Sequence, residues 1–199
     1  MNALTLFLVI YFALFLGLAF ALRSWQTWRR TGINPYKLTE RPGAEYVVTR
    51  YFRVMPFLSL AALVFYAAGA AHYTLLAPIT WLELPVLRVV GLVLMTVALV
   101  WVVIAQAQMG ESWRIGVDYD SHGPMVRRGL FKYSRNPIFV GILVSVLGFF
   151  LVLPNALTLV TLLLDLVLIQ VQVSVEEVFL EEAYGEDYNR YRREVRRWI

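Results

Sequence analysis

The chain has 199 residues, of which 59% are hydrophobic and 16% are charged, and its formal net charge is +4. A soluble domain of this length would carry about a quarter of charged residues, so the composition excludes an ordinary soluble class. With no cysteine and only two histidines, the chain has no disulfides, thiolate metal sites or cysteine nucleophile, and we predict no metal site.

Five apolar runs follow one another along the chain, and each has roughly the length that a membrane-spanning helix requires. They cover residues 3–22, 55–77, 85–106, 137–153 and 156–175. Only Pro154 and Asn155 separate the last two runs, which predicts a tight helical hairpin. We therefore predict an all-α integral membrane protein with five transmembrane helices. It should form a single membrane domain over residues 1–199, with three spans and a loop in residues 1–106 and the functional motifs in residues 107–199.

The basic residues gather in three segments between and after these runs. Residues 23–53 hold seven Lys and Arg, residues 107–137 hold five, and residues 176–199 hold five. Five spans place all three segments on one side of the membrane, and the positive-inside rule makes that side the cytoplasm. This predicts an N-terminus outside and a C-terminus inside, in the inner or plasma membrane of a prokaryote. Membrane orientation and lipid contact explain the positive charge, so we expect no nucleic-acid partner.

The stretch SRNPIFVG (134–141) opens the fourth run with a cation, a capping residue and an imino acid. Asn136 is a good N-cap and Pro137 a good first helical residue, so a helix should begin here. Its N-terminus would suit a carboxylate or a phosphate, and Arg135 adds a full positive charge. Considered alone, the same residues equally fit a capped helix with an arginine that reaches the lipid headgroups.

Residues 170–199 continue the fifth run out of the membrane. Glu176 and Glu177 stand where the apolar spacing ends, and Gly185 should end the helix. Beyond it, two tyrosines recur at helical spacing among arginines, which predicts a basic amphipathic tail helix on the cytoplasmic membrane surface. A solvated helix end and headgroup contacts are the plain structural alternative for these charges.

Together these pieces form an ordered pattern: a Gly-aromatic turn, Arg-x-Pro-x-x-x-Gly at the start of a helix, a two-helix hairpin, Glu-Glu-x-x-Leu, and Gly-x-x-Tyr-x-x-Tyr-x-x-x-Val-x-Arg. The pattern resembles the isoprenylcysteine carboxyl methyltransferase family and, more loosely, the related phospholipid methyltransferases. It covers about residues 110–199. The matching residues are Gly129, Tyr133, Arg135, Pro137, Gly141, Glu176, Glu177, Leu180, Gly185, Tyr188, Tyr191, Val195 and Arg197.

The resemblance implies an integral-membrane methyltransferase that uses S-adenosylmethionine without a Rossmann domain and methylates a lipophilic or prenylated acceptor at the cytoplasmic face. It implies cofactor-binding roles for Tyr133, Arg135, Asn136, Pro137, Phe139, Gly141, Gln172, Glu176 and Glu177. The candidate substrate-binding residues are Trp113, Tyr188, Tyr191 and Arg197. Arg135 and the helix start would hold the cofactor's carboxylate, and Glu177 or Glu176 its ammonium group. Glu177, as general base, and Arg197, as the cation that orients an anionic acceptor, are the candidate catalytic residues.

Two positions depart from the family pattern. The family usually has His where this chain has Asn136, and Tyr where it has Phe139. Asn136 still donates and accepts hydrogen bonds but cannot titrate, and Phe139 can pack on the cofactor but offers no hydroxyl.

Two other functions fit parts of the same pattern. One is an NADPH-dependent membrane reductase of the sterol-reductase type, and the other is a non-catalytic membrane scaffold or lipid-binding protein. For the methyltransferase, the acceptor stays open among a prenyl-cysteine, a phenolic or quinone-like lipid, a phospholipid amine and a hydrophobic thiol, and the oligomeric state is open too. Asp165, in the middle of the fifth run, is expected to make a hydrogen-bonded contact between helices.

Overall fold

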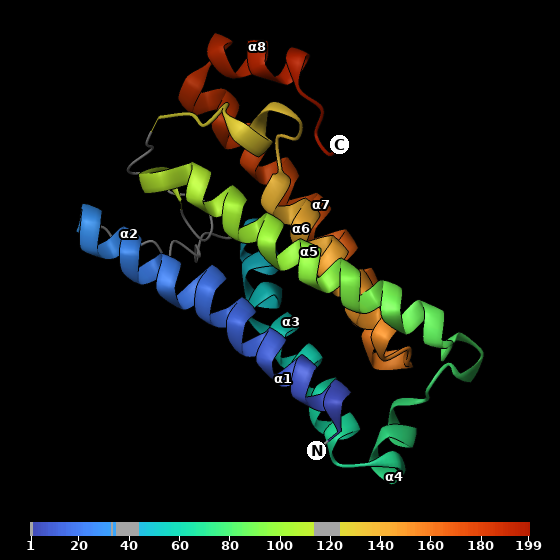
Figure 1. The fold of residues 1–199 in the computed structure, drawn as a ribbon. Coiled ribbons are helices and arrows are strands. Elements are labelled where there is room, and N and C mark those ends of the chain that lie inside the picture. Colours follow the sequence, from blue (N-terminus) through green and yellow to red (C-terminus); the bar gives the residue numbers. More distant parts are fainter. Residues whose placement is uncertain (1, 33, 35–43, 114–123) are drawn as a thin grey trace.

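The computed structural model describes residues 2–32, 34, 44–113 and 124–199. The first element is one long rod (Figure 1), in which α1 (Ala3–Leu16), the π-helical turn η1 (Gly17–Leu22) and α2 (Arg23–Thr31) follow without a break. Its 29 residues extend roughly 43 Å at 1.5 Å per residue, well beyond a hydrocarbon core of about 30 Å. The rod therefore continues past the predicted span of residues 3–22, and α2 leaves the apolar layer.

The second predicted span, residues 55–77, is wrong in both bounds. Helix α3 (Ala44–Ala67) begins earlier and accommodates Pro56 in its interior. It ends before Gly69, whose φ of 107° is a conformation that glycine alone adopts readily. The apolar residues beyond this break form only short turns, which are α4 (Ala70–Tyr73), η2 (Thr74–Leu76) and η3 (Thr80–Leu82).

The remaining helices begin where the sequence places them. They are α5 (Pro85–Met109), α6 (Pro137–Val152), α7 (Ala156–Tyr184) and α8 (Glu186–Glu194), with the short turns η4 (Gly110–Ser112) and η5 (Gly129–Lys132) between α5 and α6. The predicted hairpin is confirmed: α6 ends at Val152, α7 begins at Ala156, and the two helices pack against each other. Asn155 caps the start of α7 through a reciprocal pair of hydrogen bonds with Thr158. Gly185 ends α7 as predicted.

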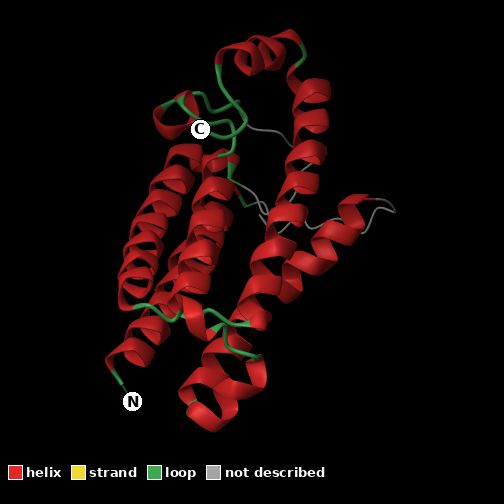
Figure 2. Cartoon of the chain, turned by 90° about the vertical axis from the view of Figure 1, so that its right-hand side faces the viewer, coloured by secondary structure: helices red, strands yellow, loops and turns green. Residues whose placement is uncertain are grey.

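Across the described residues every regular element is helical, as Figure 2 shows, so the all-α class is confirmed there. Four helical stretches are long and apolar enough to span a membrane: the α1–η1–α2 rod, α3, α5 and α7. Helix α6 is apolar but has 16 residues, which is shorter than a usual span. The protein is therefore an integral membrane protein of several helices, and the count of five spans stays a prediction.

Helices α5 and α6 pack backbone to backbone. A Cβ atom on Gly91 would lie 2.5 Å from the carbonyl oxygen of Gly148, and one on Gly148 would lie 2.8 Å from that of Gly91. Nearer the start of α6, Gly141 leaves room for Val102, and the indole of Trp101 donates to the carbonyl of Pro137 at 2.7 Å. Small residues are the usual means by which helices approach closely in a membrane, where water drives no association.

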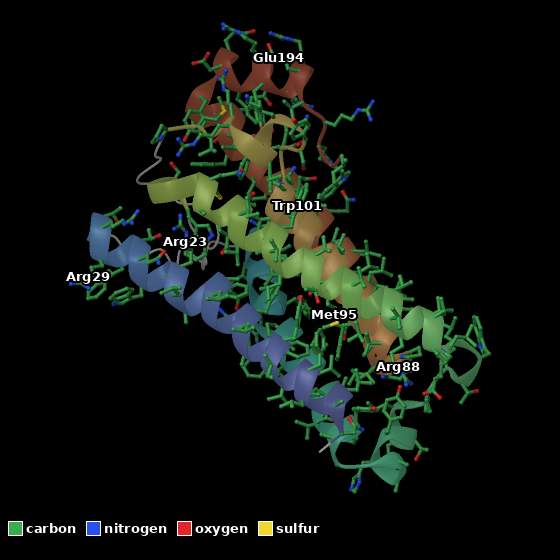
Figure 3. All side chains as sticks on the ribbon, in the orientation of Figure 1. Arg23, Arg29, Arg88, Met95, Trp101 and Glu194 are labelled. Atoms are coloured by element: carbon green, nitrogen blue, oxygen red, sulfur yellow. The ribbon has the colours of Figure 1, made fainter. Side chains whose placement is uncertain are left out.

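The rod joins this pair at the end of the bundle that carries α8, here called the α8 end (Figures 1 and 3). The wide turn η1 leaves the carbonyl of Ala19 to accept a hydrogen bond from Gln106 Nε2 at 2.9 Å. In return Arg23 Nη2 donates to the carbonyls of Gln106, at 2.7 Å, and Gly110, at 2.9 Å. These bonds fix the last turn of α5 against the rod.

Candidate active site

Three charged side chains from separate parts of the chain meet at the α8 end, and we call them the Glu177 cluster. Arg135 Nη2 lies 2.6 Å from Glu177 Oε1. Arg197 Nη2 binds Glu177 Oε2, and Arg197 Nε donates to Oε1 at 3.1 Å. The side chains of Arg135 and Glu177 are only 9% and 8% exposed, whereas that of Arg197 is 36% exposed. The pattern predicted that these residues share a site, and the structure places them in contact.

The local sequence explains how the three residues converge. Arg135 stands just before α6, Glu177 lies on α7 beyond the apolar stretch that ends at residue 175, and Arg197 follows α8. Burial alone would raise the pKa of Glu177, but hydrogen bonds and charge from Arg197 and Arg135 outweigh it and hold that pKa below its ordinary value. The carboxylate is therefore ionised at neutral pH.

The backbone of residues 192–197, here called the C-terminal segment, lies across the start of α6. The backbone N–H of Arg135 donates to the carbonyl of Arg196 at 2.9 Å. The Arg135 guanidinium donates to the carbonyls of Val195, at 2.6 Å, and Arg192, at 3.2 Å. Arg135 is thus held by neighbours on several sides, and its predicted contact with a cofactor carboxylate stays a prediction.

Asn136 occupies the N-cap position of α6 as predicted, but its side chain makes no capping hydrogen bond. Its NH₂ group donates to the carbonyl of Arg197 at 3.0 Å, so this side chain fastens the C-terminal segment to the start of α6 and does not cap the helix. The neighbouring Ser134, which sequence reasoning did not consider, accepts from the backbone N–H of Asn136 at 3.1 Å and donates to the Arg197 carbonyl at 3.4 Å.

The other predicted cofactor-binding residues lie in different surroundings. Gln172 is buried on α7, next to the cluster in sequence, and donates to Glu176 Oε1 at 3.1 Å. Phe139 stacks on Phe52 of α3, with ring centroids 6.5 Å apart. Pro137 and Gly141, by contrast, hold α6 against α5, as described above. The side chain of Tyr133 is 68% exposed, and within the described part of the chain no side-chain hydrogen bond or ring contact joins it to the cluster.

The predicted substrate-binding aromatics are all buried. Trp113 follows η4 and is 2% exposed. Tyr191 donates to the carbonyl of Phe131 at 2.7 Å, and burial raises its pKa to about 12. Tyr188 is fully buried on α8, and burial followed by the charge of Glu177 raises its pKa. Tyr191, through its hydrogen bond to Phe131, fastens α8 to the loop before α6.

Two polar groups beside the cluster lack a hydrogen bond to any described residue. They are Nε of Arg135 and the hydroxyl of Tyr188. Both atoms are shielded from solvent, and Arg135 lies close enough to Tyr188 to offset part of the rise in that tyrosine's pKa, so the two groups are neighbours inside the protein.

Comparison with known proteins decides the family. A family model described as phospholipid methyltransferase matches residues 86–187. The chain belongs to this family. The match includes Arg135 and Glu177 and ends before Tyr188 and Arg197. This is a family of membrane methyltransferases that act on lipid-like substrates. The match also confirms the resemblance seen in the sequence, because this family is related to the isoprenylcysteine carboxyl methyltransferases.

A shorter relative was also found. An uncharacterized protein of Haemophilus influenzae (strain ATCC 51907 / DSM 11121 / KW20 / Rd) is 36% identical over 63 residues, which are 31% of this chain and 100% of that protein.

Sequence reasoning missed the role of Arg23 and misjudged Asp165. In the sequence, Arg23 was interpreted only as one of the basic residues that follow the first apolar run. Its position directly after that run indicates a side chain that can reach the free carbonyls at the end of a neighbouring helix, here those of Gln106 and Gly110. Asp165 is 5% exposed, and no hydrogen bond joins it to a described residue, so the expected hydrogen-bonded helix contact is wrong.

Proposed function

We propose that this protein transfers a methyl group from S-adenosylmethionine to a lipophilic acceptor, such as an isoprenylcysteine carboxylate or a similar lipid, at the cytoplasmic face of the membrane. The observation that carries the proposal is the buried pair of Arg135 and Glu177. The amino-acid end of S-adenosylmethionine bears a carboxylate and an ammonium group. An arginine and a glutamate in contact match those two charges, one for one.

The residues fit this cofactor in kind. Arg135 would bind its carboxylate in place of one of the backbone carbonyls that its guanidinium contacts, and Glu177 would bind its ammonium group. Glu176 directly precedes Glu177 on α7, and Gln172, one turn earlier, donates to Glu176 and extends the polar surface. When bound, S-adenosylmethionine supplies a methyl group on a positively charged sulfur for transfer to a nucleophile.

The chain's own contribution is chiefly positioning. Arg197 keeps more than a third of its side chain exposed and would orient an anionic acceptor. Glu177, while bound by both arginines, is a weak base because its pKa is lowered. This favours an acceptor that needs no proton removal, such as a carboxylate, over a phenol or an amine.

Calorimetric titration of the detergent-purified protein with S-adenosylhomocysteine tests the proposal, with NADPH as the comparison ligand. We expect micromolar binding of S-adenosylhomocysteine alone, and its loss in Arg135→Ala and Glu177→Ala. Arg193→Ala is a matched control, because Arg193 forms an exposed pair with Glu186 on α8. Binding of NADPH alone would identify a reductase, and binding of neither would favour a scaffold or lipid-binding protein.

The proposed orientation needs a separate experiment. Because the chain contains no cysteine, single cysteines can be introduced at Asn2 and at Ile199 without a background signal. In right-side-out vesicles, a membrane-impermeant thiol reagent should label the first variant and spare the second. The reverse result would move the site to the outer face.

A further inference from the structure

The C-terminal segment, residues 192–197, is held differently from the helix that precedes it. Helix α8 is anchored by side-chain burial: Tyr188 and Tyr191 are buried, and Tyr191 donates to the carbonyl of Phe131 at 2.7 Å. After α8 the chain turns back toward the bundle (Figure 1), and none of residues 192–197 is buried. Apolar burial therefore secures α8, whereas the segment beyond it depends mainly on polar contacts.

These polar contacts hold the C-terminal segment against the start of α6. Arg135 donates to the carbonyl of Arg196 through its backbone N–H, at 2.9 Å, and to the carbonyl of Val195 through its guanidinium, at 2.6 Å. The NH₂ group of Asn136 donates to the carbonyl of Arg197 at 3.0 Å. The segment thus presents backbone oxygens, which carry partial negative charge, to the donors at the start of α6.

The side chain of Arg197 adds the opposite charge from the same segment. Its guanidinium contacts both carboxylate oxygens of Glu177. One short segment therefore offers oxygen atoms to Arg135 and a cation to Glu177. Under the proposed function, the amino-acid end of S-adenosylmethionine offers a carboxylate and an ammonium group to the same two residues.

The segment and the cofactor compete for the same surfaces of these two side chains. With the segment in place, the side chains of Arg135 and Glu177 are only 9% and 8% exposed. An amino-acid group has no access to a carboxylate that is covered to this extent. The contacts that would have to break are the same ones that hold the segment, because it has no buried side chain of its own.

We propose that the C-terminal segment is an autoinhibitory strap, which occupies the cofactor site and leaves it when S-adenosylmethionine binds. This inference rests on the proposed function. Cofactor binding replaces the contact of Arg197 with Glu177 and the bonds from the Arg135 guanidinium to the segment, while α8 stays anchored at Tyr191. Because only molecules with a released strap can bind, the apparent affinity for the cofactor is the intrinsic affinity reduced by the released fraction.

The affinity for S-adenosylhomocysteine tests the proposal, since a weaker strap should give tighter binding. In calorimetric titrations of the full chain in detergent, we expect R197A to bind S-adenosylhomocysteine about fivefold more tightly than the wild type. R196A is the matched control: it removes the same charge from the next residue, whose side chain is exposed and forms no hydrogen bond or ion pair with a described residue. It should change the affinity less than twofold. If R197A does not fold, R197Q should show the same direction.

The release of the strap can also be measured directly. Ile199 is 66% exposed and the chain contains no cysteine, so a nitroxide on I199C reports the mobility of the end of the chain in an electron paramagnetic resonance spectrum. Saturating S-adenosylhomocysteine should add a mobile fraction to this spectrum, and R197A should add one without any ligand. A nitroxide on R190C, which is exposed on the anchored helix α8, should show neither change.

The outcomes separate the strap from the proposed function. Equal or weaker binding of S-adenosylhomocysteine by R197A, or a label at Ile199 that stays equally immobile when the ligand is bound, would overturn the strap and leave the proposed function standing. Binding by R197A alone would support both. Absence of binding in the wild type and in R197A would overturn the proposed function, and with it the role of the segment as an occupant of the cofactor site.

Discussion

Arg135 and Glu177 lie 42 residues apart in the chain and form an ion pair of 2.6 Å in which each side chain is less than a tenth exposed. The contact joins the start of α6 to the part of α7 that leaves the apolar layer. Arg197 adds a second cation from beyond α8, so one carboxylate connects three segments. Removing a charge from this cluster should therefore affect stability as well as ligand binding.

The two arginines should differ in their effect on stability. Arg135→Ala leaves a buried carboxylate with a partly exposed partner and should lower the free energy of unfolding by about 3 kcal/mol. Arg197→Ala should lower it by about 1 kcal/mol, since more than a third of that side chain is in solvent. Denaturant unfolding in detergent, with the exposed Arg193→Ala as control, measures both. Equal losses would show that burial does not set the strength of the cluster.

The cluster should also make stability depend on acid. Because the folded-state pKa of Glu177 is held below its ordinary value of 4.5, the folded state binds fewer protons than the unfolded state near that pH. The stabilisation is complete above about pH 4.5 and is lost as the pH falls through the lowered pKa. Glu177→Gln should be less stable than the wild type at pH 7, and its stability should fall less from pH 6 to pH 3. Parallel acid curves for the two proteins would contradict this.

Gly91→Ala should separate α5 from α6. Its methyl group would lie 2.5 Å from the carbonyl oxygen of Gly148, which is backbone and cannot rotate away. We expect a loss of about 2 kcal/mol in the free energy of unfolding. Gly17→Ala is the control, because no atom lies within 4 Å of a Cβ at that position. Thermal unfolding in detergent should place the first variant below the wild type and the second at or above it.

Gly129 should tolerate alanine less well than Gly110. Both have a positive φ, of 62° and 58°, so both substitutions strain the backbone. Only at Gly129 would a Cβ also collide with the side chain of Gln108 and disturb its bond to Leu130. Gly129→Ala should therefore lose more stability, and the double variant with Gln108→Ala should recover part of the difference. No recovery would show that strain alone is responsible.

The sequence predicted those features that depend on local chemistry. Pro85 and Pro137 mark helix starts, Gly185 marks a helix end, and the short link at Pro154 and Asn155 requires a hairpin. The meeting of Arg135 with Glu177 and Arg197 was predicted from the resemblance to a family rather than from spacing.

The features that the sequence did not predict depend on contacts between distant segments. The side chain of Asn136 makes no capping hydrogen bond, and its NH₂ group instead donates to the carbonyl of Arg197, which lies 61 residues away in the chain. The second span was placed too late, because hydropathy registers the apolar residues beyond Gly69 but not the backbone turn at that glycine. Arg23 looked like an ordinary flanking cation, because its partners are carbonyls of another helix.

The π-helical turn η1 sets the angular phase between the two halves of the rod. An α-helix turns by about 100° per residue, so a single residue more or less between α1 and α2 rotates one half against the other by that angle. With η1 as it stands, Thr27 is buried and Arg23 reaches α5. A deletion of one residue within 17–22 would leave the hydropathy of the rod almost unchanged, yet it would swing Arg23 away from α5.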